Sequence, residues 1–187
     1  MGFFDTMAGV RQYEKLAEGY DGRALVDRLM ALLPQGKRVL ELGMGPGKDL
    51  DMLLETYEAL GSDASQVFVD RYRARGGRGE VMVLDAVALD VDRKFDAIYS
   101  NKVLHHLTRE TLEASLERQC VLLEPGGIAF HALWYGDKEE THEGLRFVHY
   151  TEQSLTPRVP EGFSIEEQVR YGEMADGDSF YVVLRKR

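Results

Sequence analysis

The chain has 187 residues, of which 32 are Asp or Glu and 23 are Lys or Arg, giving a formal net charge of −9. That length suits one domain with a sizeable core. An acidic surface repels phosphate backbones, so the charge argues against nucleic acid as a partner. The single cysteine, Cys120, excludes an internal disulfide and a thiolate metal site. Because the start lacks signal-peptide features and no apolar run approaches the roughly 18 residues of a membrane span, we expect a cytoplasmic protein without membrane contact.

Helix and strand patterns alternate along the chain. Apolar residues at helical spacing over residues 7–32 predict helical structure that ends at Pro34 and Gly36. We assign residues 1–36 to an N-terminal helical cap. Thr108 is the expected N-cap of the last of the later helices, which are predicted over 48–57, 64–75 and 109–122. Short apolar runs predict strands at 38–42, 59–61, 80–84, 95–100, 128–134, 163–169 and 179–185.

This series predicts a single α/β domain over residues 1–187, with an open, mostly parallel seven-stranded sheet and helices on both faces. The last two strands, within 163–187, follow one another without a helix, so we expect them to form an antiparallel hairpin at one edge. Strand 179–185 could pair there with a second copy. The core is assigned to 37–134. The polar connection 135–162 is long for a compact domain, and such connections are usually functional, which predicts a lid over the site.

A buried strand runs into Gly43, Gly45 and Gly47, and a helix follows, within the segment VLELGMGPGKDL. Glycines let the backbone approach a ligand closely, here at the switch point where open α/β sheets bind ligands. A dinucleotide fingerprint needs a glycine where the chain has Lys48, and a P-loop needs one where it has Leu42. Both phosphate-binding interpretations therefore fail.

With Glu41 as its acidic residue, this segment resembles motif I of the class I S-adenosylmethionine-dependent methyltransferases, hydrophobic-hydrophobic-[DE]-x-G-x-G-x-G. Later segments are similar to other motifs of the family in the expected order, so the resemblance covers residues 38–134. It implies a Rossmann-like fold, S-adenosylmethionine as the cofactor, S-adenosylhomocysteine as the product, and methyl transfer as the reaction. The reactive methyl group belongs to the cofactor, so the protein has to bind and orient.

The resemblance also implies cofactor contacts beyond Glu41 and the three glycines. Asp63 would accept hydrogen bonds from the ribose hydroxyls, although an N-cap role in the next helix is the alternative. The remaining implied contacts are Ala64, Asp85 and Ala86 at the adenine, Ser100 and Asn101 at the methionine part, and Tyr13 and Tyr20 from the N-terminal cap.

Residues after the fourth and fifth strands are candidates for contact with the methyl acceptor. His105 could orient or deprotonate an acceptor, because histidine titrates near neutrality, or it could simply pack. The other candidates for contact with the acceptor are His131, Trp134, Tyr135 and Arg146.

The fourth strand ends in SNKV rather than in the [DN]-P-P-[YF] motif of enzymes that methylate amino groups of DNA or protein glutamine, which favours a small-molecule acceptor.

Two alternatives keep the same fold. One is a non-catalytic S-adenosylmethionine-binding partner or regulatory subunit, which the retained glycines and Asp63 disfavour. The other is an aminopropyl transferase, for which we identify no acidic polyamine site. No spacing of His, Cys or acidic residues matches a metal site, so no metal is expected. The expected assembly is a monomer or a homodimer.

Overall fold

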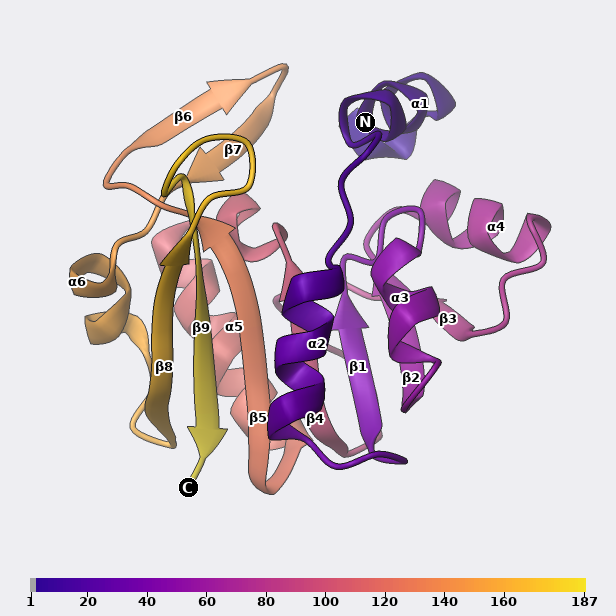
Figure 1. Cartoon of the computed structure of the whole chain (residues 1–187). Helices are drawn as coiled ribbons and strands as arrows, with labels where there is room; N and C mark the ends of the chain where they lie inside the picture. Colours follow the sequence, from indigo (N-terminus) through magenta and orange to yellow (C-terminus); the bar gives the residue numbers. More distant parts are fainter. Residues whose placement is uncertain (1–2) are drawn as a thin grey trace.

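Within residues 3–187, which the computed structural model describes, seven strands form one sheet in the order β3-β2-β1-β4-β5-β9-β8 (Figure 1). β9 (Ser179–Lys186) runs antiparallel to β5 on one side and to β8 (Phe163–Tyr171) on the other. The predicted Rossmann-like α/β fold with an antiparallel edge hairpin is confirmed. The parallel strands are β1 (Arg38–Leu42), β2 (Glu58–Asp63), β3 (Glu80–Val83), β4 (Phe95–Asn101) and β5 (Leu123–Trp134).

One detail of the hairpin differs from the prediction. The edge strand is β8, whereas β9 lies inside the sheet with hydrogen-bonded neighbours on both sides. The suggestion that 179–185 could pair with a second copy is therefore wrong, because its backbone groups are already used within the sheet.

Helices cover both faces of the sheet and bury an apolar cluster on each. α2 (Arg23–Leu32), α3 (Lys48–Leu53) and α4 (Gln66–Ala74) cover one face, and α5 (Arg109–Leu122) and the short α6 (Glu152–Leu155) cover the other. Thr108 caps α5 as predicted, since its side chain accepts a hydrogen bond from the Thr111 N–H. Among residues 3–187, no helix combines the length and the apolar character that a membrane span requires.

The N-terminal cap is two helices rather than one run over 7–32. α1 (Met7–Leu16) and α2 are separated by residues 17–22, where Gly19 has a φ of +87°. Lys48 Nζ donates to the backbone carbonyls of Ala17 (3.2 Å) and Tyr20 (2.9 Å), which satisfies carbonyl groups that follow the end of α1. The break therefore comes from a left-handed glycine and a long-range lysine contact, which the apolar spacing does not reveal.

The connection 135–162 contains regular structure. β6 (Glu139–His142) and β7 (Leu145–Val148) form a separate two-stranded hairpin, and α6 and a 3-10 turn, η3 (Thr156–Arg158), follow. In Figure 1 this hairpin and α1 both lie beyond the carboxyl ends of the parallel strands. They flank the place where open α/β sheets bind ligands.

Side chains of the central strands alternate between the two faces, and this alternation decides which of them reach the crevice. In β1, Leu40 packs in the α5-side cluster, so Glu41 points to the side of α2 and α3. In β4, Ile98 packs in the α5-side cluster, so Ser100 shares that face and Asn101 points the opposite way. Glu41 and Asn101 are thereby brought to the same side of neighbouring strands.

Candidate active site

The glycine turn between β1 and α3 meets Asp63 at the end of β2. The Gly45 N–H donates to Asp63 Oδ2 at 2.9 Å, and the Ser65 N–H donates to Asp63 Oδ1 at 2.8 Å. Burial raises the pKa of Asp63, while these two N–H donors act in the opposite direction. α4 takes its N-cap from Ser65, whose hydroxyl accepts from the Phe68 N–H, so the alternative that Asp63 caps this helix is wrong. Asp63 is instead a buried carboxyl group fixed by backbone donors at the crevice.

Of the three glycines, Gly45 is the one with room beside it. A β-carbon on Gly43 would lie 2.4 Å from a Val103 methyl group, and one on Gly47 would lie 2.4 Å from the Tyr72 ring. A β-carbon on Gly45 would have Tyr13 Cε1 as its nearest neighbour, at 3.6 Å, and Gly45 has a φ of +52°. Gly43 and Gly47 therefore serve close packing, and Gly45 lines the crevice beneath Tyr13.

Asp49, in the first turn of α3, ties the crevice together. Its Oδ1 accepts from the Gly22 N–H at 3.0 Å, and its Oδ2 accepts from Tyr99 Oη at 2.8 Å and from Asn101 Nδ2 at 3.0 Å. Within the described residues, Glu41 Oε2 and Asn101 Oδ1 are buried without a hydrogen-bond partner. Buried acceptors of this kind call for a donor.

Charge accumulates at the same place. Burial raises the pKa of Glu41 well above its usual range, and the neighbouring carboxylates Asp49 and Asp63 raise it further. Tyr13 covers the turn from α1, and its ring contacts those of Phe4 and Phe68 edge-on, with centroids 5.5 and 5.8 Å away. The crevice is a negatively charged site roofed by an aromatic ring.

His105 lies on the acceptor side, in the 3-10 turn η2 (Leu104–His106) after β4. Its ring stacks on Phe147 of β7 with centroids 5.2 Å apart and lies 6.4 Å from the Trp134 ring. Burial lowers the pKa of His105 well below its usual value, with His106 and Lys102 adding to the effect. Both ring nitrogens are buried and lack a partner among the described residues. His105 is thus a neutral imidazole with unused hydrogen-bonding capacity.

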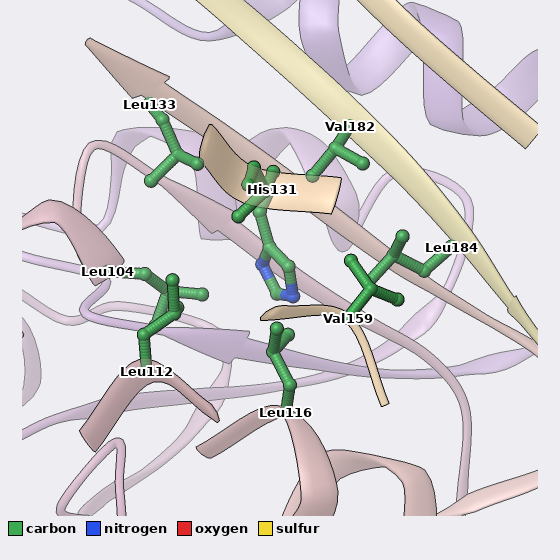
Figure 2. Close-up of a pocket in the computed structure, with 9 residues that line it drawn as sticks. Leu104, Leu112, Leu116, His131, Leu133, Val159, Val182 and Leu184 are labelled. Atoms are coloured by element: carbon green, nitrogen blue, oxygen red, sulfur yellow. The ribbon is translucent and has the colours of Figure 1, made fainter. Parts of the chain in front are cut away.

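Ser100 and His131 belong to the opposite face of the sheet. His131 Nδ1 lies 2.8 Å from Ser100 Oγ, and His131 Nε2 lies 2.8 Å from Gln119 Oε1, so both ring nitrogens are satisfied. Burial lowers the pKa of His131 to about 3. Figure 2 shows the ring among leucine and valine side chains, beside a cavity of about 10 Å³, which is at the lower limit for one water molecule. Contrary to expectation, the His131 side chain is a core residue and the Ser100 side chain points away from the crevice, because strand alternation turns both toward α5.

Lys102 and Glu173 are functional candidates that sequence reasoning missed, as it missed Asp49. Lys102 directly follows β4 with a φ of +56°, and its ammonium lies 2.7 Å from Glu173 Oε2 and 2.9 Å from Ser179 Oγ. The same ammonium lies 4.2 Å from the centre of the Trp134 ring. Asp49 could have been noticed as an acid directly after the glycine turn, but the Lys102–Glu173 pair joins segments 71 residues apart and leaves no local signal.

Asp85, Ala86 and Ala64 lie at the ends of β3 and β2. Asp85 Oδ1 accepts from the N–H groups of Val87 (2.8 Å) and Ala88 (2.7 Å) and closes the turn after β3. The Ala86 carbonyl accepts from Ser115 Oγ, and Ala64 is exposed.

Two of the remaining candidates, Tyr135 and Arg146, already have partners. Tyr135 Oη donates to Glu152 at 3.2 Å, and Arg146 pairs with Glu139 at 2.6 Å. Tyr20 lines a surface hollow of about 390 Å³ on the outer side of α3.

The strand order, the glycine turn and the acids at the ends of β1 and β2 are those of the Rossmann-like methyltransferase fold that the motifs imply. A family model described as a methyltransferase domain matches residues 39–127, which run from β1 through α5 into the start of β5. Residues 39–127 therefore form a methyltransferase domain, and the fold is that of the class I S-adenosylmethionine-dependent methyltransferases, whose cofactor is S-adenosylmethionine.

The tRNA (carboxymethyluridine(34)-5-O)-methyltransferase alkbh8 of Xenopus tropicalis is 32% identical over 130 residues, which make up 68% of this chain and 20% of that protein. The chain spans less than half the length of the curated relatives it matches.

Solved structures share the fold at low identity. A S-adenosylmethionine-dependent methyltransferase from Clostridium acetobutylicum superposes with a TM-score of 0.76 at 13% identity, covering 94% of this chain and 96% of that one. The N-methyltransferase NodS of Bradyrhizobium japonicum, in complex with S-adenosylhomocysteine, superposes with a TM-score of 0.70 at 19% identity, covering 88% and 84%.

Proposed function

We propose that the chain transfers a methyl group from S-adenosylmethionine to a small-molecule acceptor at the carboxyl ends of β1, β2 and β4. The proposal is carried by Glu41 Oε2 and Asn101 Oδ1, two buried acceptor atoms on one side of the sheet without a partner in the described part of the chain. Leaving such an atom unsatisfied costs about 1–3 kcal/mol. The methionine part of the cofactor carries an ammonium group whose N–H donors fit this pair.

The other cofactor contacts follow the order of the strands. Asp63 would accept from the ribose hydroxyls beside Gly45, and the turn at Asp85 and Ala86, with Ala64, would border the adenine. Tyr13 and the segment around Tyr20 would cover the cofactor from the N-terminal side. When bound, S-adenosylmethionine supplies an electrophilic methyl group, so the task of the chain is to hold the acceptor in line and to exclude water.

The acceptor would lie next to His105 and Trp134. Both ring nitrogens of His105 lack a partner in the part of the chain that the structure describes, which supports a role in orienting the acceptor or accepting its proton. Tyr135 and Arg146 are weaker candidates because each is already paired with a carboxylate.

The distribution of charge supports a small acceptor over tRNA, which the name of the Xenopus relative specifies. The densest basic stretch of the chain lies on and after α4, and three of its arginines are engaged in ion pairs. Arg71 pairs with Glu14 and Arg75 pairs with Asp51, both at 2.7 Å. With a formal net charge of −9, the surface offers little for a phosphate backbone. A cytoplasmic monomer or homodimer completes this proposal.

Residues 1–36 and 135–162 would act together as the lid. Gln12 Nε2 on α1 donates to both carboxylate oxygens of Glu143, at 3.0 and 2.8 Å, and thereby bridges α1 and the turn of the β6–β7 hairpin. Closure of this kind excludes water from the site and keeps the substrate bound until it reacts. The core 37–134 and the strands 163–187 would supply the fixed part of the site.

Thermal unfolding with and without ligands tests the proposal. A ligand at about 100 times its Kd stabilises the folded state by about 2.7 kcal/mol, which should raise the Tm by about 5–10 °C for a chain of this size. We expect this shift with S-adenosylmethionine and S-adenosylhomocysteine and none with NAD. No shift with either sulfur ligand would refute the proposal, and binding without turnover of any acceptor would favour the non-catalytic alternative.

A further inference from the structure

Four carboxyl groups from different elements act electrostatically on Tyr13 at the crevice. Burial, and then the charges of these groups, raise the pKa of Tyr13 to about 12; they are Asp63, Asp49, Glu173 and Glu41. Bound S-adenosylmethionine brings a net single positive charge, and Lys102 provides another. Even with Glu41 protonated, the carboxylates outnumber these two positive charges, so the site keeps a negative potential.

Three basic side chains near the ends of β4 and β5 are paired with carboxylates, whereas Arg170 stacks on the Tyr135 ring, 4.0 Å from its centre, and donates to the Gly177 carbonyl. Lys102 is bound to Glu173, Arg146 to Glu139 at 2.6 Å, and Arg109 lies 3.6 Å from Asp137. An anionic acceptor would find no unpaired cation among these three side chains and would pay for burial beside carboxylates.

Glu173 and His105 present unused acceptor atoms around one aromatic ring. Lys102 Nζ and Tyr171 Oη both bind Glu173 Oε2, which leaves Glu173 Oε1 without a bond among the described residues. His105 is 2% exposed, and neither of its ring nitrogens has a partner within residues 3–187. The Trp134 ring lies next to both, at 6.4 Å from the His105 ring and 4.2 Å from the ammonium that Glu173 holds.

We propose that the acceptor is an amine, bound between Glu173 Oε1 and the His105 imidazole beside the Trp134 ring; this inference rests on the proposed methyl transfer. The bound ammonium first loses one proton to solvent, which frees the nitrogen lone pair. Methylation then forms an N–CH3 bond from that lone pair while the S–CH3 bond breaks and its electrons stay on sulfur. The positive charge moves from sulfur to nitrogen, and a second proton can then leave the methylated nitrogen for solvent. A carboxylate and an aromatic face stabilise that charge as it develops, whereas an anionic acceptor gains nothing from them.

Three probes of one shape and different charge test the inference: benzylamine, benzyl alcohol and benzoate. Each is titrated calorimetrically into the protein saturated with S-adenosylhomocysteine. We expect benzylamine to bind at least about tenfold more tightly than benzoate, from one charge-assisted hydrogen bond, with benzyl alcohol between them. Tighter binding of benzoate, or no binding of benzylamine, would overturn the inference. Loss of S-adenosylhomocysteine binding would instead overturn the proposed function.

Two variants separate amine recognition from a structural role of the Lys102–Glu173 pair. Glu173→Gln should weaken benzylamine about tenfold and leave benzyl alcohol unchanged. Lys102→Met should keep or tighten benzylamine binding, because it frees the Glu173 carboxylate. If Glu173 only anchors Lys102, both variants will weaken benzylamine equally, and the inference fails. The matched control is Glu166→Gln, which removes a carboxylate of the same hairpin that pairs with Arg185 and should leave all three probes unchanged.

Discussion

The two faces of β4 and β5 carry buried polar groups that differ in how completely their hydrogen bonds are made. On the α5 face, His131 is bonded to Ser100 and Gln119, Gln119 Nε2 donates to Ser115 Oγ, and Ser115 Oγ donates to the Ala86 carbonyl. Each of these four polar side chains has a hydrogen-bond partner. On the α2 and α3 face, Glu41 Oε2 and Asn101 Oδ1 have none among the described residues, and beyond the end of β4 the same is true of both nitrogens of His105.

This difference distinguishes a polar network that stabilises the fold from a group of polar atoms that a bound ligand would satisfy. A complete network fixes a core, and a buried polar atom left without a partner costs stability that only an external partner recovers. The α5-face network should therefore control stability, and the crevice should control binding. Variants on the two faces test whether stability and binding separate in this way.

The largest expected effect is the acid sensitivity caused by His131. Its folded-state pKa of about 3 lies below the ordinary value of 6.5, so the unfolded chain binds the proton first as the pH falls. The stability is fully present above pH 6.5 and is lost down to about pH 3, by up to about 5 kcal/mol. Urea unfolding at a series of pH values should show this slope in the wild type and a flatter one in His131→Gln.

His142→Gln is the control for that series, because His142 is an exposed residue of the β6–β7 hairpin. It should leave the pH slope unchanged. A His131→Gln variant with the wild-type slope would show that the α5-face network does not hold the histidine neutral.

The next effect in size is the loss of cofactor binding in Gly45→Val. A β-branched residue is strongly disfavoured at a φ of +52°, and its side chain would enter the space between the turn and Tyr13. We expect a loss of affinity for S-adenosylhomocysteine of about a thousandfold, or about 4 kcal/mol, measured by calorimetry. Wild-type affinity in this variant would remove Gly45 from the crevice. Gly36→Val, at a positive φ in open space far from the crevice, is the control for backbone strain alone.

The sequence predicted the sheet, the edge hairpin and the glycine turn because each depends on local periodicity or on a contiguous motif. It could not predict which face of the sheet each side chain occupies. Ser100 and Asn101 are consecutive polar residues at the end of β4, and their side chains point to opposite faces. Lys102 and Glu173 were missed for a related reason. Their contact joins β4 to the loop after β8, and a long-range pair leaves no spacing to detect.

A smaller effect on binding is expected for Asp63→Asn. Asparagine keeps the shape and one acceptor for the N–H groups of Gly45 and Ser65 but loses the charge that would face the ribose. Affinity for S-adenosylhomocysteine should fall about tenfold to a hundredfold, and the Tm should fall by a few degrees because one of the two N–H groups then faces the amide NH2. Asp70→Asn, on the exposed side of α4, should change neither quantity. Unchanged affinity in Asp63→Asn would show that the ribose lies elsewhere.

The smallest effect, Glu41→Gln, has opposite signs for stability and for binding. The folded-state pKa of Glu41 is raised by burial, so the folded protein binds the proton more tightly than the unfolded chain, and stability falls as the pH rises above the usual carboxyl range. Glutamine cannot ionise, so without ligand the variant should be more stable than the wild type at pH 8 by on the order of 1 kcal/mol and equal to it near pH 4. Affinity for S-adenosylhomocysteine should fall at the same time, because the charged acceptor for the ammonium is lost. Urea unfolding at both pH values, paired with calorimetry, checks the two signs together. A destabilised Glu41→Gln at pH 8 would mean that Glu41 is satisfied within the fold, and the crevice would then resemble the α5 face rather than contrast with it.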